Sequence, residues 1–401
     1  MSDQPNSGAT SAPLDFPLGN LILLAAAGFL TMLTEAVPAG LLPAMAQGLD
    51  AADALTGQLL TAYAGASMLM AIPLVAATKH IPRKPLILAT VLGIAVANLI
   101  TAISPMFWLT MVARLVGGGA AALQWALLAG YAMRMVDPAH QGRALSVAMA
   151  GIPLALAFGV PFGAFLGDLF GWRFVFMGIA ASGVLLALAG ARALPVIKSE
   201  NAATGTVLSA LRLPGLGIVL IGAGAFQLGH MNFYTYVAPF LIEQGNPLPV
   251  SSFLLVLGLA AVAGLVFTGA VVDKHLALLA TTAMMLFAVG MLLVATIDAV
   301  PAMIVAIIAW GLGLGAAPTV FQTACARVSG PQIDQAQSLL VTVFNAGMAG
   351  GSALGGGLLA KMGSAANLPL VSVGIFVGIA VLLLATHNRS LPAGAASLNA
   401  M

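Results

Sequence analysis

The chain has 401 residues, of which 6% are charged and 61% are hydrophobic, and 46 are glycine. Because an ordinary soluble domain carries about 25% charged residues, this composition excludes a soluble enzyme, a nucleic-acid-binding protein and a disordered chain. The single cysteine, Cys325, excludes an internal disulfide and a cysteine metal cluster.

The order of polar and apolar segments predicts a membrane protein. Residues 1–17 are polar and lack the features of a signal peptide, so we expect an uncleaved tail. Twelve apolar stretches follow, each long enough to cross a membrane at about 20 residues per crossing. We therefore predict an all-α membrane protein with two six-helix halves (residues 18–195 and 213–387), a linker (196–212) and a second tail (388–401). The predicted spans are 18–45, 54–77, 85–103, 106–133, 144–167, 174–195, 213–242, 250–272, 276–296, 300–323, 336–360 and 367–386.

Basic residues gather in alternate loops. With the N-terminus inside the cell, 11 of the 14 lysines and arginines lie on the cytoplasmic side, and the positive-inside rule favours this orientation. We expect a multi-pass protein of the cell (inner) membrane with both termini in the cytoplasm. The 11 residues are Lys79, Arg83, Lys84, Arg134, Arg143, Arg192, Lys198, Arg212, Lys274, Arg327 and Arg389.

The two halves carry weak signs of a duplication. Moving the first half forward by 196 residues places Pro43 on Pro239 and also aligns other landmarks. Several matches at one offset favour two halves of like orientation, which is the pseudo-symmetric arrangement of transporters that bind substrate between parallel repeats near mid-membrane. The other pairs are Gly119 with Gly315, Gln141 with Gln337 and Gly151 with Gly347.

Several segments resemble one transporter family. The first span reads TEAVPAGLLPAMAQGL from Thr34, and the fourth contains ARLVGGGAAA around Arg114. The fifth reads GIPLALAFGVPFGAFLGDLFGWRFVF from Gly151, and the seventh contains TYVAPFL from Thr235. These segments are similar to the drug:proton antiporter branch of the major facilitator superfamily, specifically the arabinose-efflux-permease-like proteins. The resemblance implies the twelve-helix major facilitator fold and export of a small organic solute, a drug, nucleoside or sugar, in exchange for protons.

The loop after the second span departs from that family. It reads TKHIPRK from Thr78, which keeps the basic end of the family motif but lacks its aspartate, whereas the second copy of the loop has an aspartate. A charge gate at this end of the molecule would therefore use Asp273 or helix termini. The candidate gating residues are Lys79, Arg83, Lys84, Asp273 and Lys274.

Two ionisable residues other than histidine lie deep inside predicted spans, Glu35 and Arg114. Each lies eight residues from the outer end of its span, about 12 Å deep, so the two side chains could meet. We predict that Glu35 carries a proton, because it is ionised beside Arg114 or water and protonated when a rearrangement removes that partner. Two alternatives remain open: a permanent ion pair that orients two helices, or an arginine that holds backbone carbonyls near Gly117, Gly118 and Gly119.

Polar and aromatic side chains on three spans predict a central cavity. Spacings of i, i+3 and i+7 place three residues of the seventh span on one helical face, and an i, i+4 pair does so in the first. We predict that they bind substrate; interhelical hydrogen bonding and core packing are the alternatives. The candidates are Thr31, Glu35, Trp125, Gln227, His230 and Tyr234.

The fifth span is rich in glycine and proline, which allow close helix approach and a bend. A bend that changes would let the first half rock, whereas a static kink would only shape packing. The candidate conformational residues are Gly151, Pro153, Gly159, Pro161 and Gly163.

The sequence lacks a phosphate-binding loop, a His-Glu-x-x-His metal motif and a serine elbow. We expect no cofactor, metal, enzymatic activity or nucleic-acid partner, and a monomer whose partners are a small solute, protons and lipid. The alternatives are a uniporter or symporter in which Glu35 and Arg114 are structural, and, from other classes, an intramembrane enzyme or a channel.

Overall fold

The computed structural model describes residues 16–78, 80–137, 140–197, 211–297, 299–329 and 332–386. Within these residues every regular element is a helix. Eleven helical stretches in this part of the chain are long and apolar enough to cross a membrane, and α2, with 26 residues, has the length of a twelfth.

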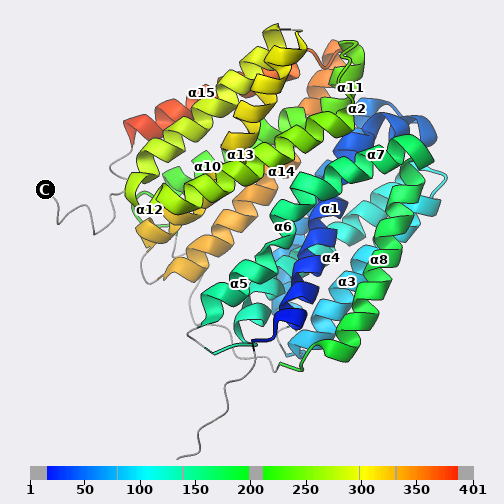
Figure 1. Cartoon of the computed structure of the whole chain (residues 1–401), viewed down its shortest axis with the longest axis vertical. Helices are drawn as coiled ribbons and strands as arrows, with labels where there is room; N and C mark the ends of the chain where they lie inside the picture. Colours follow the sequence, from blue (N-terminus) through cyan, green and yellow to red (C-terminus); the bar gives the residue numbers. More distant parts are fainter. Residues whose placement is uncertain are drawn as a thin grey trace, which may run out of the picture.

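The first half contains six crossings, of which the fifth is interrupted. It consists of α5, α6, a π-helix (η2) and α7 in succession. Figure 1 shows this half, coloured blue to green, as one bundle. The helices are α1 (Leu18–Gly48), α2 (Asp53–Thr78), α3 (Arg83–Ile103), α4 (Phe107–Met133), α5 (Gln141–Met149), α6 (Gly151–Leu154), η2 (Ala155–Gly159), α7 (Val160–Phe170) and α8 (Trp172–Ala193).

The second half forms the other bundle, coloured green to red in Figure 1. Its first crossing is broken after Tyr234, and its longest helix bends at the non-helical residue His275, so that this helix supplies two crossings. The helices are α10 (Leu216–Tyr234), α11 (Val237–Glu243), α12 (Val250–Thr296), α13 (Val300–Ser329), α14 (Ile333–Met362) and α15 (Leu368–Ala385).

Equivalent glycines in the two halves allow the same close helix packing within each half. A Cβ atom at Gly151 would overlap with the Ala25 carbonyl in α1, and one at Gly347 would overlap with the Gly224 carbonyl in α10. Because such backbone contact leaves no room for a side chain, the fifth crossing of each half lies directly against the first crossing of that half.

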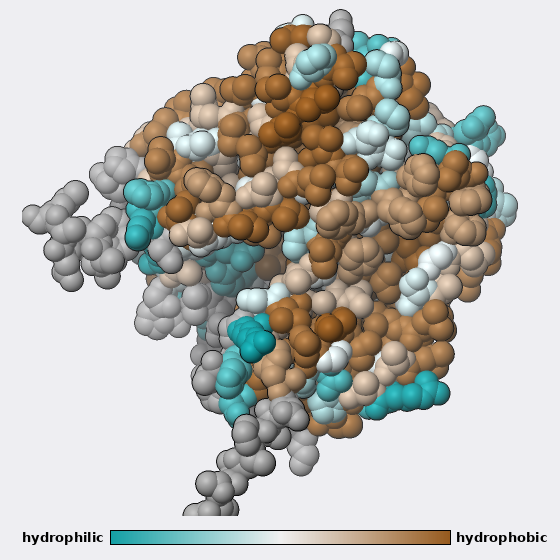
Figure 2. Space-filling model, in the orientation of Figure 1, coloured by the Kyte–Doolittle hydropathy of each residue, from teal (hydrophilic) through white to brown (hydrophobic). Residues whose placement is uncertain are grey.

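Large hydrophobic side chains cover much of the outer surface, including Trp108, Leu185 and Val266, each at least 67% exposed. Figure 2 shows apolar residues over much of one face, with hydrophilic residues near its edges and in the hollow left of centre. This distribution fits a surface in contact with lipid.

Candidate functional site

A cavity of about 650 Å³ lies between the two halves, within the size range of small-molecule sites. Helices α1, α4 and α5 to α7 line it from the first half, and α10, α12, α13 and α14 from the second. Most lining residues are apolar. The polar or ionisable ones are Glu35, Gln227, His230, Tyr234, Gln322, Gln337 and Asn345.

The cavity extends toward one end of the bundle. Its lining reaches Ala129 near the end of α4, Leu145 in α5 and Gln337 near the start of α14. Arg134 and Arg143 lie at this same end, in and next to the connection between α4 and α5. The cavity is therefore directed toward an end with basic side chains.

At the opposite end, Tyr236 connects the halves. It lies in the break between α10 and α11, and its hydroxyl is 3.1 Å from the Ser352 carbonyl oxygen in α14 and 3.5 Å from the Ala54 carbonyl oxygen in α2. A Cβ atom at Gly57 or Gly356 would overlap with the tyrosine hydroxyl. This contact was not predicted from the sequence, although Gly57 and Gly356, near the ends of the second and eleventh spans, were a signal of close packing there.

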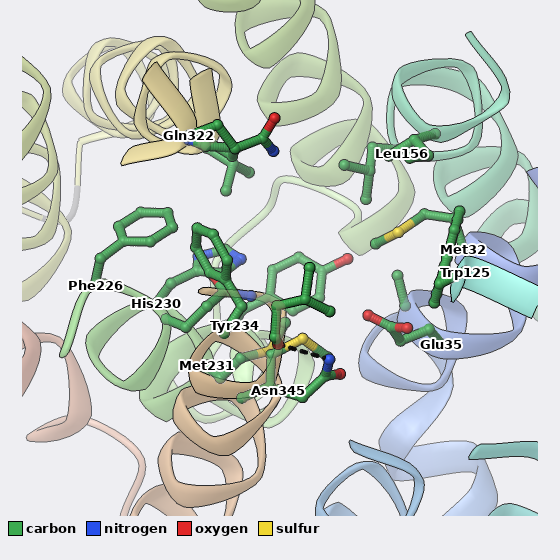
Figure 3. A pocket seen from close by; sticks show the side chains of 18 of the residues that line it. Met32, Glu35, Trp125, Leu156, Phe226, His230, Met231, Tyr234, Gln322 and Asn345 are labelled. Carbon is green, nitrogen blue, oxygen red and sulfur yellow. Dashed lines mark hydrogen bonds between the residues drawn. The ribbon is translucent and has the colours of Figure 1, made fainter. Parts of the chain in front are cut away.

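Glu35 lies on α1 and is the one aspartate, glutamate, lysine or arginine among the described residues that line the cavity. Figure 3 shows its side chain opposite Phe226, His230 and Tyr234, with Trp125 on its own side. The charge of the lining therefore depends on whether this single carboxyl group is protonated.

Arg114 is buried in the first half, and its guanidinium donates a 2.8 Å hydrogen bond to the Thr34 carbonyl oxygen. That carbonyl lies four residues before Pro38, which has no N–H to donate along the helix. The guanidinium also stacks over the Tyr63 ring, 4.6 Å from its centroid. Among the described residues Arg114 and Glu35 form no ion pair. Arg114 holds a backbone carbonyl, as one alternative suggested, but this carbonyl is in α1 and not beside the glycines of α4.

Thr31 differs from the expectation that it faces the substrate. It is fully buried, donates a 2.9 Å hydrogen bond to Ala27 and accepts one from Gln124 of α4. Met32, one residue later, lines the cavity instead. The face of α1 that carries Thr31 is therefore used for helix packing, and we do not include Thr31 in the proposed site.

The other four candidate substrate-binding residues, Trp125, Gln227, His230 and Tyr234, all line the cavity. The rings of Phe226 and His230 are parallel within 5°, with centroids 6.3 Å apart, and the His230 and Tyr234 rings are 5.0 Å apart. These three side chains form an aromatic wall on α10, facing Glu35 across the cavity (Figure 3).

The glycines and prolines of the fifth crossing surround the π-helix η2. Pro153 precedes it and Pro161 follows it, and Pro161 cannot donate a hydrogen bond back to Ala157. Such a missing bond is a known cause of local departure from α-helix. Additional Cβ atoms at Gly159 and Gly163 would lie 2.7 Å from Phe29 and Val37, so both glycines permit close contact with α1.

The same π-helix contacts the second half. A Cβ atom at Gly258 of α12 would lie 2.5 Å from both the Leu156 carbonyl oxygen and the Ala157 Cα. Leu156 and Gly258 also line the cavity. The irregular segment therefore lies where the two halves meet beside the candidate site.

Of the candidate gating residues, Lys79 lies outside the described residues, as does the side chain of Asp273. Arg83 and Lys84 begin α3, and Lys274 directly precedes the bend of α12 at His275. A part for these residues in gating remains a prediction.

Comparison with protein families matches residues 24–352 to the Major Facilitator Superfamily. The chain belongs to this superfamily. This family membership, together with the fold, confirms the prediction that the protein is a membrane transporter and not an enzyme. The helical architecture agrees with the predicted twelve-helix fold. In transporters built from parallel repeats the substrate site lies between the halves, which is where this cavity is.

Solved structures of Major Facilitator Superfamily transporters resemble the chain over nearly its whole length. A bacterial homolog of the human lysosomal transporter Spinster, in an inward-facing and unoccupied conformation, is 17% identical with a TM-score of 0.72, covering 96% of this chain and 99% of that one. The human organic anion transporter MFSD10 is 16% identical with a TM-score of 0.68, covering 92% and 99%. At these identities the likeness shows the fold alone.

Proposed function

We propose that this transporter exports a small organic solute in exchange for protons, and that Glu35 carries the proton. The observation that supports this most is the position of Glu35 as the one charged group among the described residues lining the cavity between the halves. Intramembrane ionisable residues are costly and usually functional. A carboxyl group in a cavity that opens alternately to the two sides can take up a proton on one side and release it on the other.

Antiport follows if solute and proton occupy the same cavity in turn. Glu35 and the aromatic wall face each other across one space (Figure 3), so a bound solute changes the surroundings of the carboxyl group. A cationic or hydrogen-bonding solute favours the ionised form, and its departure favours protonation. Each solute that leaves would then be replaced by a proton.

The side to which the cavity opens in this conformation is inferred from charge. The cavity extends toward the end that carries Arg134 and Arg143, and basic loops of membrane proteins face the cytoplasm. In this conformation the cavity would therefore accept solute from the cytoplasm. Efflux itself is proposed from the resemblance to drug:proton antiporters, and loading from the cytoplasm is the step that efflux requires of this conformation.

Arg114 has an indirect part in this proposal. It holds the carbonyl oxygen of Thr34, the residue directly before Glu35, and it is not among the lining residues. We therefore assign it to positioning the backbone of α1, so that the carboxyl group of Glu35 is directed into the cavity.

The lining favours a neutral or cationic cargo of drug-like or sugar-like chemistry. The single charged group among its described lining residues is an acid, which would repel an anion, and its polar groups are mainly amides amid apolar and aromatic side chains. One structural relative is named as an organic anion transporter, so the charge of the cavity argues for a different cargo here.

The alternative is a uniporter or a proton symporter in which Glu35 and Arg114 are structural. The observation that favours it is that Arg114 bonds to the backbone and not to Glu35. Proteoliposomes that contain a pH-sensitive dye can separate the possibilities when gradients of sugars, nucleosides and cationic dyes are imposed. Antiport predicts proton movement opposite to the solute; solute movement without proton movement, or with protons in the same direction, would reject it.

A further inference from the structure

His230 has one ring nitrogen fixed by a neighbouring helix. The indole Nε1–H of Trp310 in α13 donates a 3.2 Å hydrogen bond to Nδ1 of His230. Trp310 is fully buried, and the Phe287 and Trp310 rings contact the imidazole edge-on, with centroids 6.0 and 5.7 Å away. The histidine is therefore held from behind, on the side away from the cavity.

This bond determines where the imidazole carries its proton. A tryptophan indole can only donate, so Nδ1 of His230 must accept and cannot itself hold a hydrogen. In the neutral ring the proton then lies on Nε2. Adding a second proton at Nδ1 would place two donors against each other and break the bond to Trp310, so the packing favours a neutral imidazole of fixed tautomer.

The second ring nitrogen faces the cavity. His230 is a lining residue, and no described residue accepts a hydrogen bond from its Nε2. The Nε2 atom is not one that protein encloses without a hydrogen-bond partner. It therefore has contact with open space. Figure 3 shows the ring at the cavity wall between Phe226 and Tyr234.

We propose that His230 presents a fixed Nε2–H donor to the cargo, and that Phe226, His230 and Tyr234 form a subsite for a planar aromatic group bearing a hydrogen-bond acceptor. The inference rests on the proposed role of the cavity in binding cargo, but not on proton exchange. Trp310 is the positioning residue, and His230 selects the cargo without relaying protons.

Two physical features give this subsite its selectivity. Phe226, His230 and Tyr234 all line the cavity, and an aromatic wall of this kind suits edge-to-face or offset contact with an aromatic ligand. A ligand without an acceptor would leave the Nε2–H unpaired when it displaces water, which weakens binding. A ring nitrogen or carbonyl on the ligand avoids that loss.

The tautomer can be measured without any transport assay. Two-bond ¹H–¹⁵N NMR spectra of ¹⁵N-histidine-labelled protein distinguish the two tautomers and the imidazolium, and the His230→Asn variant identifies its signals among the five histidines. At neutral pH we expect His230 to be protonated on Nε2 alone. Trp310→Phe should produce a mixture of tautomers, whereas Trp108→Phe, at an exposed surface site, should leave the spectrum unchanged. Protonation on Nδ1 in the unmodified protein would overturn the proposal.

The ligand class is tested with two probes that differ in one ring atom, quinoline and naphthalene, of which only quinoline has a hydrogen-bond acceptor. Saturation-transfer NMR should show that the protein binds the quinoline about tenfold more tightly, and that His230→Phe removes the difference. Equal binding of the two probes, or no binding of either, would reject the subsite. Because neither readout uses a proton gradient, failure here would not be confused with failure of proton exchange.

Discussion

Arg114 donates a hydrogen bond to the carbonyl oxygen of Thr34, the carbonyl that Pro38 leaves without a helical donor. A buried arginine thus supplies the hydrogen bond that proline cannot donate in the helix that carries Glu35. Transmembrane helices tolerate proline where a neighbouring helix satisfies the freed carbonyl, and here α4 provides the donor.

This relationship predicts a specific pair of mutational effects. Arg114→Met should lower the free energy of unfolding by about 1.5–3 kcal/mol, the usual contribution of a hydrogen bond to a charged group. Pro38→Ala returns an N–H to the helix, so the Arg114→Met penalty should be smaller in the Pro38→Ala background. Thermal unfolding of the two single variants and the double variant in detergent measures this coupling. An equal penalty in both backgrounds would show that Arg114 acts through another contact.

The Tyr236 contact predicts a shift between conformations. Tyr236→Phe removes the hydroxyl that approaches Ser352 and Ala54, so the state closed at this end should lose about 0.5–1.5 kcal/mol, roughly a two- to tenfold change in population. Spin labels at Asp50 and Lys361, near this end in the two halves, can report the opening as a longer distance.

The matched control is Tyr131→Phe. Its hydroxyl bonds to the Pro195 carbonyl oxygen at 2.5 Å, so this bond lies wholly within the first half. The label distances should not change in this variant. A shift of the same size in both variants would mean that loss of any buried tyrosine hydroxyl loosens the bundle.

The contact between α12 and the π-helix predicts that Gly258→Ala impairs transport. The new methyl group would lie 2.5 Å from backbone atoms of residues 156 and 157, so the halves must separate locally in this conformation. We expect at least a severalfold loss of solute flux. Gly269→Ala lies in the same helix with no atom within 4 Å of its added Cβ and should retain flux. Normal flux in Gly258→Ala would show that the halves do not depend on this close approach.

Much of the fold was predictable because long apolar segments have few alternatives to a membrane-spanning helix. The predicted spans agree with the described helices to within a few residues at most ends. The break at Tyr236 was not predicted, since residues 213–242 form one continuous apolar stretch. The side chain of Tyr236 fits between α2 and α14. A contact of this kind joins the two halves at single residues, so it produces no periodic pattern in the sequence of either half.

The site was predictable in part for a related reason. Helical spacing correctly grouped Gln227, His230 and Tyr234 on the face that lines the cavity. Helical spacing shows which residues share a face, but not which neighbouring helix packs against that face. Thr31 was therefore predicted to line the cavity, although it accepts a hydrogen bond from Gln124 of α4. The bond from Arg114 to Thr34 had a signal in the sequence, because Pro38 frees the carbonyl four residues earlier.

Glu35→Gln tests proton exchange with the smallest change in shape. Asp50→Asn is the matched control, since it removes a carboxylate at an exposed position after the same helix. With any solute from the panel that the unmodified protein exchanges for protons, dye-loaded proteoliposomes should show that Asp50→Asn retains solute-driven proton flux. Glu35→Gln should abolish that proton flux, while binding of the solute remains measurable. Full solute-driven proton flux in Glu35→Gln would contradict the assignment of Glu35 as the proton carrier.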